Sequence, residues 1–230
     1  GVLICLFAAH PSLGDEQTHS WLPPKDTGAT RITQVEIPGK VSDAQRFRIE
    51  NAGALEPIIF RLPRVASLLH NDFEASINVV ASAAGARPGL IVLLPQQLDP
   101  RTGQPLQMIV GGDALRDVDV AKKLVVKATK QAINAQLRST RAELHQSDIN
   151  VRGAIVVGLA IVLDALPGEH FIQLGEVEYG PVIPPDEGMI ALAENAFGTI
   201  RSTTVRRDFL PLDISLDSIQ INRQPIILRM

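Results

Sequence analysis

Two acidic side chains near residue 177 are the first candidates for ligand chemistry. Glu176 and Glu178 lie two residues apart in a stretch where apolar and polar residues alternate, and Tyr179 follows them. On a strand, residues two apart point to the same face, so the two carboxylates would lie side by side. Carboxylate oxygens accept hydrogen bonds from sugar hydroxyls or bind calcium. We therefore take Glu176, Glu178 and Tyr179 as candidate ligand-binding residues, and a solvated strand face as the alternative.

A second acidic group lies before an expected strand at residues 122–127. Asp113, Asp117 and Asp119 fall within one short stretch, and calcium takes oxygen ligands from such loops. We take these three residues as a candidate calcium site. An ordinary solvated loop is the alternative.

The sequence contains no recognisable catalytic set. None of its five histidines stands in an HExxH pattern, and neither a GxSxG elbow nor a P-loop occurs. The single cysteine, Cys5, lies in the apolar first stretch, which leaves the rest of the chain without a thiol nucleophile or a cysteine-based zinc site. We therefore identify no catalytic residues in this chain, which leaves open whether it belongs to an enzyme such as a glycoside hydrolase, and calcium is the only candidate cofactor. The net charge of −3 and the sequence pI near 6.0 argue against a nucleic-acid partner.

The elements that would position these residues are mostly strands. Residues 130–145 carry apolar side chains at helical spacing and predict one amphipathic helix. The sequence of residues 51–73 shows no regular pattern, so we expect irregular chain there, with a short helix or turn at 64–70. Strands are expected at residues 32–38, 46–50, 75–82, 90–94, 106–110, 122–127, 154–163 and 171–179. Short strands separated by turn residues favour a mainly β, jelly-roll-like β-sandwich with the helix as an insertion.

The first stretch is typical of an export signal. Residues 1–9 (GVLICLFAA) are apolar, and Ser12 and Gly14 supply small residues at the positions before a cleavage site. We expect a secretory signal at 1–14 that lacks its charged first part, with a buried first strand as the alternative. The apolar run is shorter than the roughly 20 residues that span a bilayer, so we expect no transmembrane segment. The expected location is secreted or periplasmic.

The remaining chain divides by composition. Residues 15–31 are polar and contain Pro23, Pro24 and Gly28, which predicts a linker. The sandwich is expected at 32–185, a connector at 186–214, and the start of a following domain at 215–230.

Two stretches carry a resemblance to known families. The order of expected strands over residues 46–184, with the turn at 163–168 before the strand at 171–179, resembles the carbohydrate-binding-module-like (galactose-binding-like) jelly roll. Residues 219–229 (IQINRQPIILR) resemble the segment that leads into the (β/α)8 barrel of glycoside hydrolases, with Asn222, Pro225 and Arg229 in matching positions. Secreted bacterial glycoside-hydrolase-like proteins join the two parts. The resemblance implies a polysaccharide ligand, and a C-terminal barrel of the same chain as a partner.

Two hypotheses follow for the sandwich. It is a non-catalytic module that binds a glycan or cell-surface polymer and positions a downstream glycosidase-like barrel, or it is a purely structural interdomain module without a small ligand. A sheet face lined by polar side chains and an aromatic ring favours binding. An apolar face favours the structural role.

Overall fold

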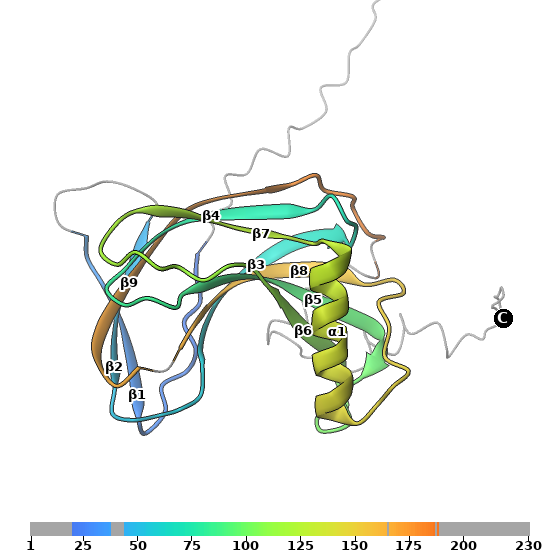
Figure 1. Cartoon of the computed structure of the whole chain (residues 1–230), viewed down its shortest axis with the longest axis horizontal. Helices are drawn as coiled ribbons and strands as arrows, with labels where there is room; N and C mark the ends of the chain where they lie inside the picture. The colour runs from blue at the N-terminus through green and yellow to red at the C-terminus, as the bar shows by residue number, and fades with distance from the viewer. Residues whose placement is uncertain (1–19, 38–43, 165, 187, 189–230) are drawn as a thin grey trace, which may run out of the picture.

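The computed structural model describes residues 20–37, 44–164, 166–186 and 188. In this part of the chain, strands form two antiparallel sheets, and a helix packs beside them (Figure 1). The five-stranded sheet has the order β1 (Thr30–Val35), β2 (Gln45–Asn51), β9 (Gly168–Gly180), β4 (Glu74–Ala81), β7 (Lys122–Lys127). The four-stranded sheet has the order β3 (Ile58–Leu68), β8 (Ile155–Leu163), β5 (Arg87–Leu98), β6 (Pro105–Gly111).

The strand orders define a jelly roll. From β2 to β9 the chain crosses from one sheet to the other at each step, except at the hairpin between β5 and β6. As a result, β2, β9, β4 and β7 form one layer and β3, β8, β5 and β6 the other, with β1 added at the edge beside β2. The predicted jelly-roll-like β-sandwich is confirmed.

The core lies between the two sheets because alternate residues of each strand are apolar and point inward. In β4 these are Ala75, Ile77, Val79 and Ala81, all nearly inaccessible to solvent. Across the layers, the rings of Phe47 and Phe60 lie 4.9 Å apart between centroids. Strand β8 is buried over most of its length on both faces, as its continuous apolar sequence predicts.

The predicted helix is also confirmed. α1 (Lys130–Leu144) begins after Thr129, whose side-chain oxygen accepts a hydrogen bond from the Ala132 N–H at 3.2 Å. It ends at His145, which adopts the left-handed conformation of a helix C-cap. The helix packs on β6, and Ile133 and Leu137 are buried in the main core.

The prediction for residues 51–73 is wrong for residues 58–68. Residues 58–68 form β3, an edge strand of its sheet, and no helix forms at 64–70. Pro63 argues against a central strand, but an edge strand tolerates a residue without an N–H. The register of β3 against β8 shifts between Pro63 and Ser67, so the irregularity is absorbed as a bulge.

The described part of the expected linker packs on the sandwich. Trp21 is 3% exposed and belongs to the main core, and its backbone N–H donates to Gln45 Oε1 at 2.6 Å. Leu22 exchanges two backbone hydrogen bonds with Arg61 of β3, at 2.7 and 2.9 Å. Residues 20–31 therefore belong to the folded unit, and β1 begins at Thr30.

The expected signal at 1–14, nearly all of the expected connector, and the expected following domain at 215–230 lie outside the described residues. Among the described helices, none has the length and apolar character needed to cross a membrane.

Candidate functional site

The outer face of the five-stranded sheet is polar. Because Phe47 and Ile49 of β2 point into the core, Arg46, Arg48 and Glu50 point outward. The pairing of β1, β2 and β9 places these side chains in three rows, which are Arg31–Glu50–Glu169, Thr33–Arg48–Phe171 and Val35–Arg46–Gln173. Charged groups, amides and one aromatic ring thus share this face.

Contacts within the rows hold several of these groups in place. Arg48 Nε lies 3.1 Å from Glu169 Oε2, and Arg48 Nη1 lies 3.6 Å from Glu50 Oε2. The guanidinium carbon of Arg46 lies 4.1 Å from the centroid of the half-buried Phe171 ring. A cation over a ring face is attracted by the ring quadrupole, so Arg46 and Phe171 orient each other.

An open cleft of about 440 Å³ lies at the end of this face. Its volume is within the range of small-molecule sites. Arg31 and Glu50, which form the first row of the outer face, also line the cleft, so cleft and face are continuous. The other lining residues come from the turn before β1, the end of β2 and the start of β9; they are Asp26, Thr27, Gly28, Ala29, Thr30, Asn51, Ala52 and Gly168.

Asn51 holds the loops around the cleft together. Its side-chain oxygen accepts from the N–H groups of Gly53 and Ala54 at 3.0 and 2.8 Å. Its amide nitrogen donates to the carbonyls of Ala54 and Leu166 at 3.1 and 3.2 Å. Asn51 is 4% exposed, so these hydrogen bonds satisfy a buried amide. The walls are therefore fixed before any ligand arrives.

The turn before β1 is held in a similar way. Asp26 Oδ1 accepts from the Ile32 N–H and Thr27 Oγ1 from the Thr30 N–H, both at 3.0 Å. Arg31 differs from these residues, since its exposed guanidinium makes no hydrogen bond or ion pair with any residue that the structure describes. The cleft thus presents an uncommitted donor group next to the Glu50 carboxylate.

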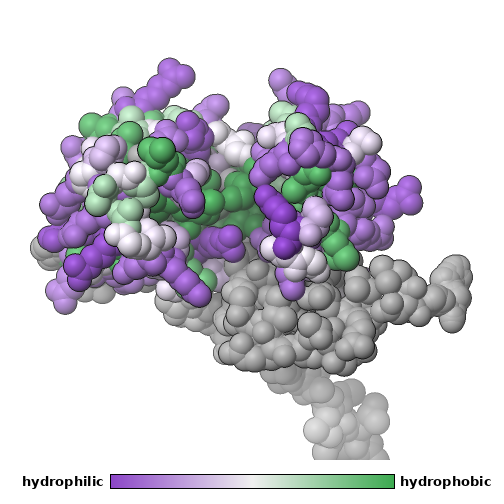
Figure 2. Space-filling model, turned by 90° about the horizontal axis from the view of Figure 1, so that it is seen from below, coloured by the Kyte–Doolittle hydropathy of each residue, from purple (hydrophilic) through white to green (hydrophobic). Residues whose placement is uncertain are grey.

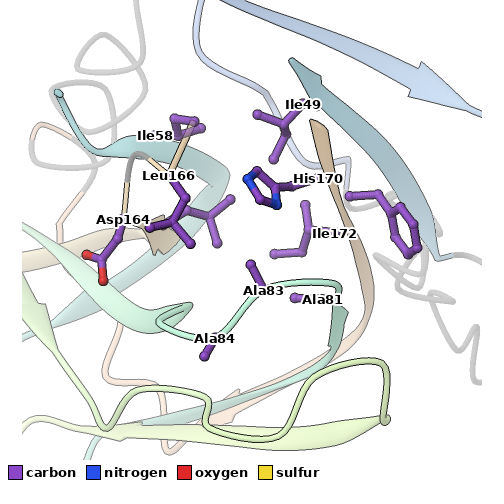
Figure 3. Close-up of a pocket in the computed structure, with 11 residues that line it drawn as sticks. Ile49, Ile58, Ala81, Ala83, Ala84, Asp164, Leu166, His170 and Ile172 are labelled. Carbon is purple, nitrogen blue, oxygen red and sulfur yellow. The ribbon is translucent and has the colours of Figure 1, made fainter. Parts of the chain in front are cut away.

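A second, apolar pocket lies at one end of the sandwich, between the two sheets (Figure 3). The His170 ring lies among Ile49, Ile172 and Leu166, while the carboxylate of Asp164 points away from them. His170 Nε2 is 3.1 Å from the carbonyl oxygen of Pro167. The free space is about 20 Å³, which is room for about one water molecule. This pocket is a packing gap and does not admit a sugar ring.

The structure brings Glu176 and Glu178 to the same outer face, as their spacing predicts. Both are exposed on β9, and Glu178 Oε1 lies 3.2 Å from Lys123 Nζ of β7. Tyr179 does not join them. Its side chain packs against the core, and its ring centroid lies 6.3 Å from that of Phe73.

The three aspartates of the candidate calcium site have separate surroundings. Asp117 Oδ2 lies 2.9 Å from Lys122 Nζ. The N–H of Asp119, a residue with φ of 58°, donates to the Ala81 carbonyl at 2.8 Å. Across the described ranges, no group of three or more His, Cys, Asp or Glu side chains is placed to hold a metal ion. The structure therefore does not gather Asp113, Asp117 and Asp119 into a set of calcium ligands.

The cleft residues were not identified from the sequence. The composition of residues 15–31 predicts a linker, and the alternation at 46–50 (RFRIE) predicts a strand with Arg46, Arg48 and Glu50 on one face but no ligand site. The usable signal was the pattern Asp26–Thr27, since Asp and Thr side chains often cap the N–H groups of a tight turn.

Comparison with known proteins gives likenesses of structure only. Neither a protein-family model nor a curated protein matches the chain. Among solved structures, one from a study of promiscuous carbohydrate-binding modules of the β-sandwich superfamily is similar at a TM-score of 0.38 and 8% identity. The similarity covers 73% of this chain and 59% of that one, so this chain spans less than two thirds of its length.

Two further solved structures are also carbohydrate-binding modules. One, in complex with β-1,4-galactotriose, has a TM-score of 0.31 and 12% identity, covering 70% of this chain and 87% of that one. The other contains such a module joined to an endo-1,4-β-D-xylanase of Clostridium thermocellum, complexed with xylohexaose. Its TM-score is 0.35 and its identity 13%, covering 68% of this chain and 26% of that one.

Proposed function

We propose that this chain is a non-catalytic module that binds a glycan in the cleft beside Arg31 and along the adjoining outer face of the five-stranded sheet. One observation carries the proposal. The cleft of about 440 Å³ opens directly onto a face where charged and amide side chains surround a half-buried aromatic ring.

The chemistry of these groups suits a sugar. Each hydroxyl of a glycan both donates and accepts hydrogen bonds, so it pairs with guanidinium donors and with carboxylate acceptors. Arg31 supplies the donors and Glu50 an acceptor in the cleft. Phe171, further along the face, offers to the C–H groups of a sugar the part of its ring that the Arg46 guanidinium does not cover. A chain of several sugar units laid along the rows would meet both kinds of contact.

A binding assay against a panel of soluble polysaccharides tests this proposal. The chain should bind at least one of them, and Arg31→Ala should weaken that binding about tenfold or more, since a hydrogen bond to a charged group contributes roughly 1.5–3 kcal/mol. Arg152→Ala is the matched control because Arg152 is also an exposed arginine and lies in the turn before β8. Absence of binding to every polysaccharide, or equal affinities of the two variants, would contradict the proposal.

We further propose that the module is exported and positions a glycosidase-like barrel of the same protein. The signal-like pattern at 1–14 and the barrel-like segment at 219–229 support this setting. Cell fractionation with an antibody raised against the sandwich tests it. Recovery of the protein from the periplasm or the medium is expected, and recovery from the cytoplasm alone would refute export.

A second candidate function is a structural role between domains without a small ligand. It is favoured by the outer face of the other sheet, which is apolar and carries buried aliphatic side chains such as Ile91 and Leu93. The two roles use opposite faces of the sandwich, so one chain can combine them.

A further inference from the structure

The outer face of the four-stranded sheet carries a second cluster of buried apolar side chains. In β5, Leu90, Val92 and Leu94 point into the sandwich, while the alternate residues Ile91 and Leu93 point to the other side. Strand β8 repeats this arrangement, with Val156 inside. The outward residues form a separate apolar cluster, which we call the outer cluster and which consists of Ile91, Leu93, Ile155, Val157 and Ala160.

The outer cluster is buried. Its five residues are 0–1% exposed. In the described part of the chain, the hydrophobic residues packed against it all belong to the same four-stranded sheet; they are Ile59, Leu68, Ile109 and Val162. Large aliphatic side chains on a bare sheet face keep part of their surface in water, so burial to this degree requires a covering layer. Neither α1 nor the five-stranded sheet contributes a hydrophobic residue to it.

The outer cluster itself is buried and is not visible on the surface, but other hydrophobic residues are. Seen from below, hydrophobic residues gather in the hollow between two hydrophilic flanks (Figure 2). The left flank lies on the side of β1 and β2, and the right flank on the side of α1 (Figure 1).

The chain passes the edge of this face as it leaves the described region. The Leu68 N–H donates to the Ile183 carbonyl at 2.7 Å, and the Ile183 N–H donates to Ser67 Oγ at 3.0 Å. Residues 181–186 therefore run along the free edge of β3. The roughly 40 residues from 189 to 230 start from this edge. Four strands are about 19 Å across, which an extended chain crosses in about six residues.

The composition of residues 189–230 fits an apolar face. The segment opens with MIAL and contains the aliphatic runs IQI at 219–221 and IIL at 226–228. Residues 1–19 are the competing cover, because Leu22 also pairs with β3. However, the residues that directly precede Ser20 in the sequence, DEQTH at 15–19, are polar.

We propose that residues 189–230 dock across the outer cluster and form a third layer on the four-stranded sheet. The docked segment excludes water from Ile91, Leu93, Ile155 and Val157. The sandwich would thereby hold its own C-terminal segment, and anything that follows it, on the face opposite the proposed glycan cleft.

Hydroxyl-radical footprinting of side chains tests the proposal on the full chain and on two shortened chains. One shortened chain ends at Gly188, and the control begins at Ser20. In the chain ending at Gly188, labelling of Ile91, Leu93 and Ile155 should rise by roughly an order of magnitude, because labelling follows exposure and these side chains are now 0–1% exposed. The inward residues Val92 and Val156 should stay unlabelled, which shows that the sandwich remains folded. The control chain should match the full chain.

Two results of the footprinting would overturn the proposal. One is strong labelling of the outer cluster in the full chain. The other is protection that persists without residues 189–230, or that disappears on removal of residues 1–19 instead.

A second measurement needs no truncation and decides the matter if the chain ending at Gly188 unfolds. Benzoylphenylalanine in place of the half-buried Ile109, at the rim of the outer cluster, is photoactivated in the full chain, and the linked peptide is identified by mass spectrometry. Linkage to residues 189–230 of the same molecule supports the proposal. Linkage to residues 1–19 or to a second copy, or no linkage, overturns it. Because the glycan cleft lies on the other sheet, the result of its Arg31→Ala test does not depend on whether residues 189–230 dock here.

Discussion

Replacing Trp21 by alanine tests whether the segment before β1 is part of the folded unit. The indole is 3% exposed among the core side chains, so its removal takes away buried apolar surface and leaves a cavity. Such a truncation costs about 3–5 kcal/mol of unfolding free energy. For a domain of this size, that corresponds to a melting temperature lower by about 6–20 °C. Urea unfolding followed by far-UV circular dichroism measures the loss, and the m-value should not change.

The neighbouring residue supplies the control. Leu22 is 43% exposed, so Leu22→Ala should cost about 1 kcal/mol or less. Trp21→Phe should retain most of the stability, because a second ring fills much of the same space. If Trp21→Ala were no more destabilising than Leu22→Ala, residues 20–31 would behave as a linker and the packing described for them would be refuted.

Two further predictions concern individual polar groups. Asn51→Asp should lower the unfolding free energy by about 3 kcal/mol, because it replaces the amide donor to two carbonyls by a buried carboxylate. Asn78→Asp is the control, since Asn78 is exposed. In the same urea titration it should change the unfolding free energy by less than about 0.5 kcal/mol. The hydrogen bond from the Arg101 side chain lowers the pKa of Asp99, so this pair adds stability above the ordinary carboxyl pKa, and the contribution is lost as the pH falls through the lowered value. In Arg101→Ala, NMR titration of the Asp99 carboxyl carbon should show its pKa moving up toward the ordinary value, and an unchanged pKa would contradict the assignment.

Local pattern was enough to predict the parts of the fold that depend on local periodicity. The helix at 130–144 and the strongly apolar strand β8 follow from residue spacing alone. Strand β3 was missed because Pro63 excludes a central strand, whereas its tolerance at an edge depends on the order of strands in the sheet. Trp21 was missed because the polar, proline-containing residues around it are typical of a linker, and its side chain is buried by core residues that are distant in the sequence.

The candidate site was predictable only in part, for a similar reason. The shared face of Glu176 and Glu178 follows from their spacing of two. The cleft combines residues 26–31 with residues 50–52 and Gly168, which meet only once β1, β2 and β9 are paired. Tyr179 was placed with the glutamates because it is adjacent to them, although neighbouring strand residues point to opposite faces.

The pairing of β9 with β4 contains one extra residue. Ile77 lies opposite Val177 and Val79 opposite Leu174, so Gly175 and Glu176 together face the single residue Asn78. If one of these two residues were removed, β9 would alternate regularly, and Leu174, Val177 and Tyr179 would all still face the core. Position 175 is therefore where the strand can lose one residue during evolution without changing which side chains are buried. An aligned relative that lacks a residue here would keep the same core. A deletion elsewhere in β9 would exchange its buried and solvent-exposed faces.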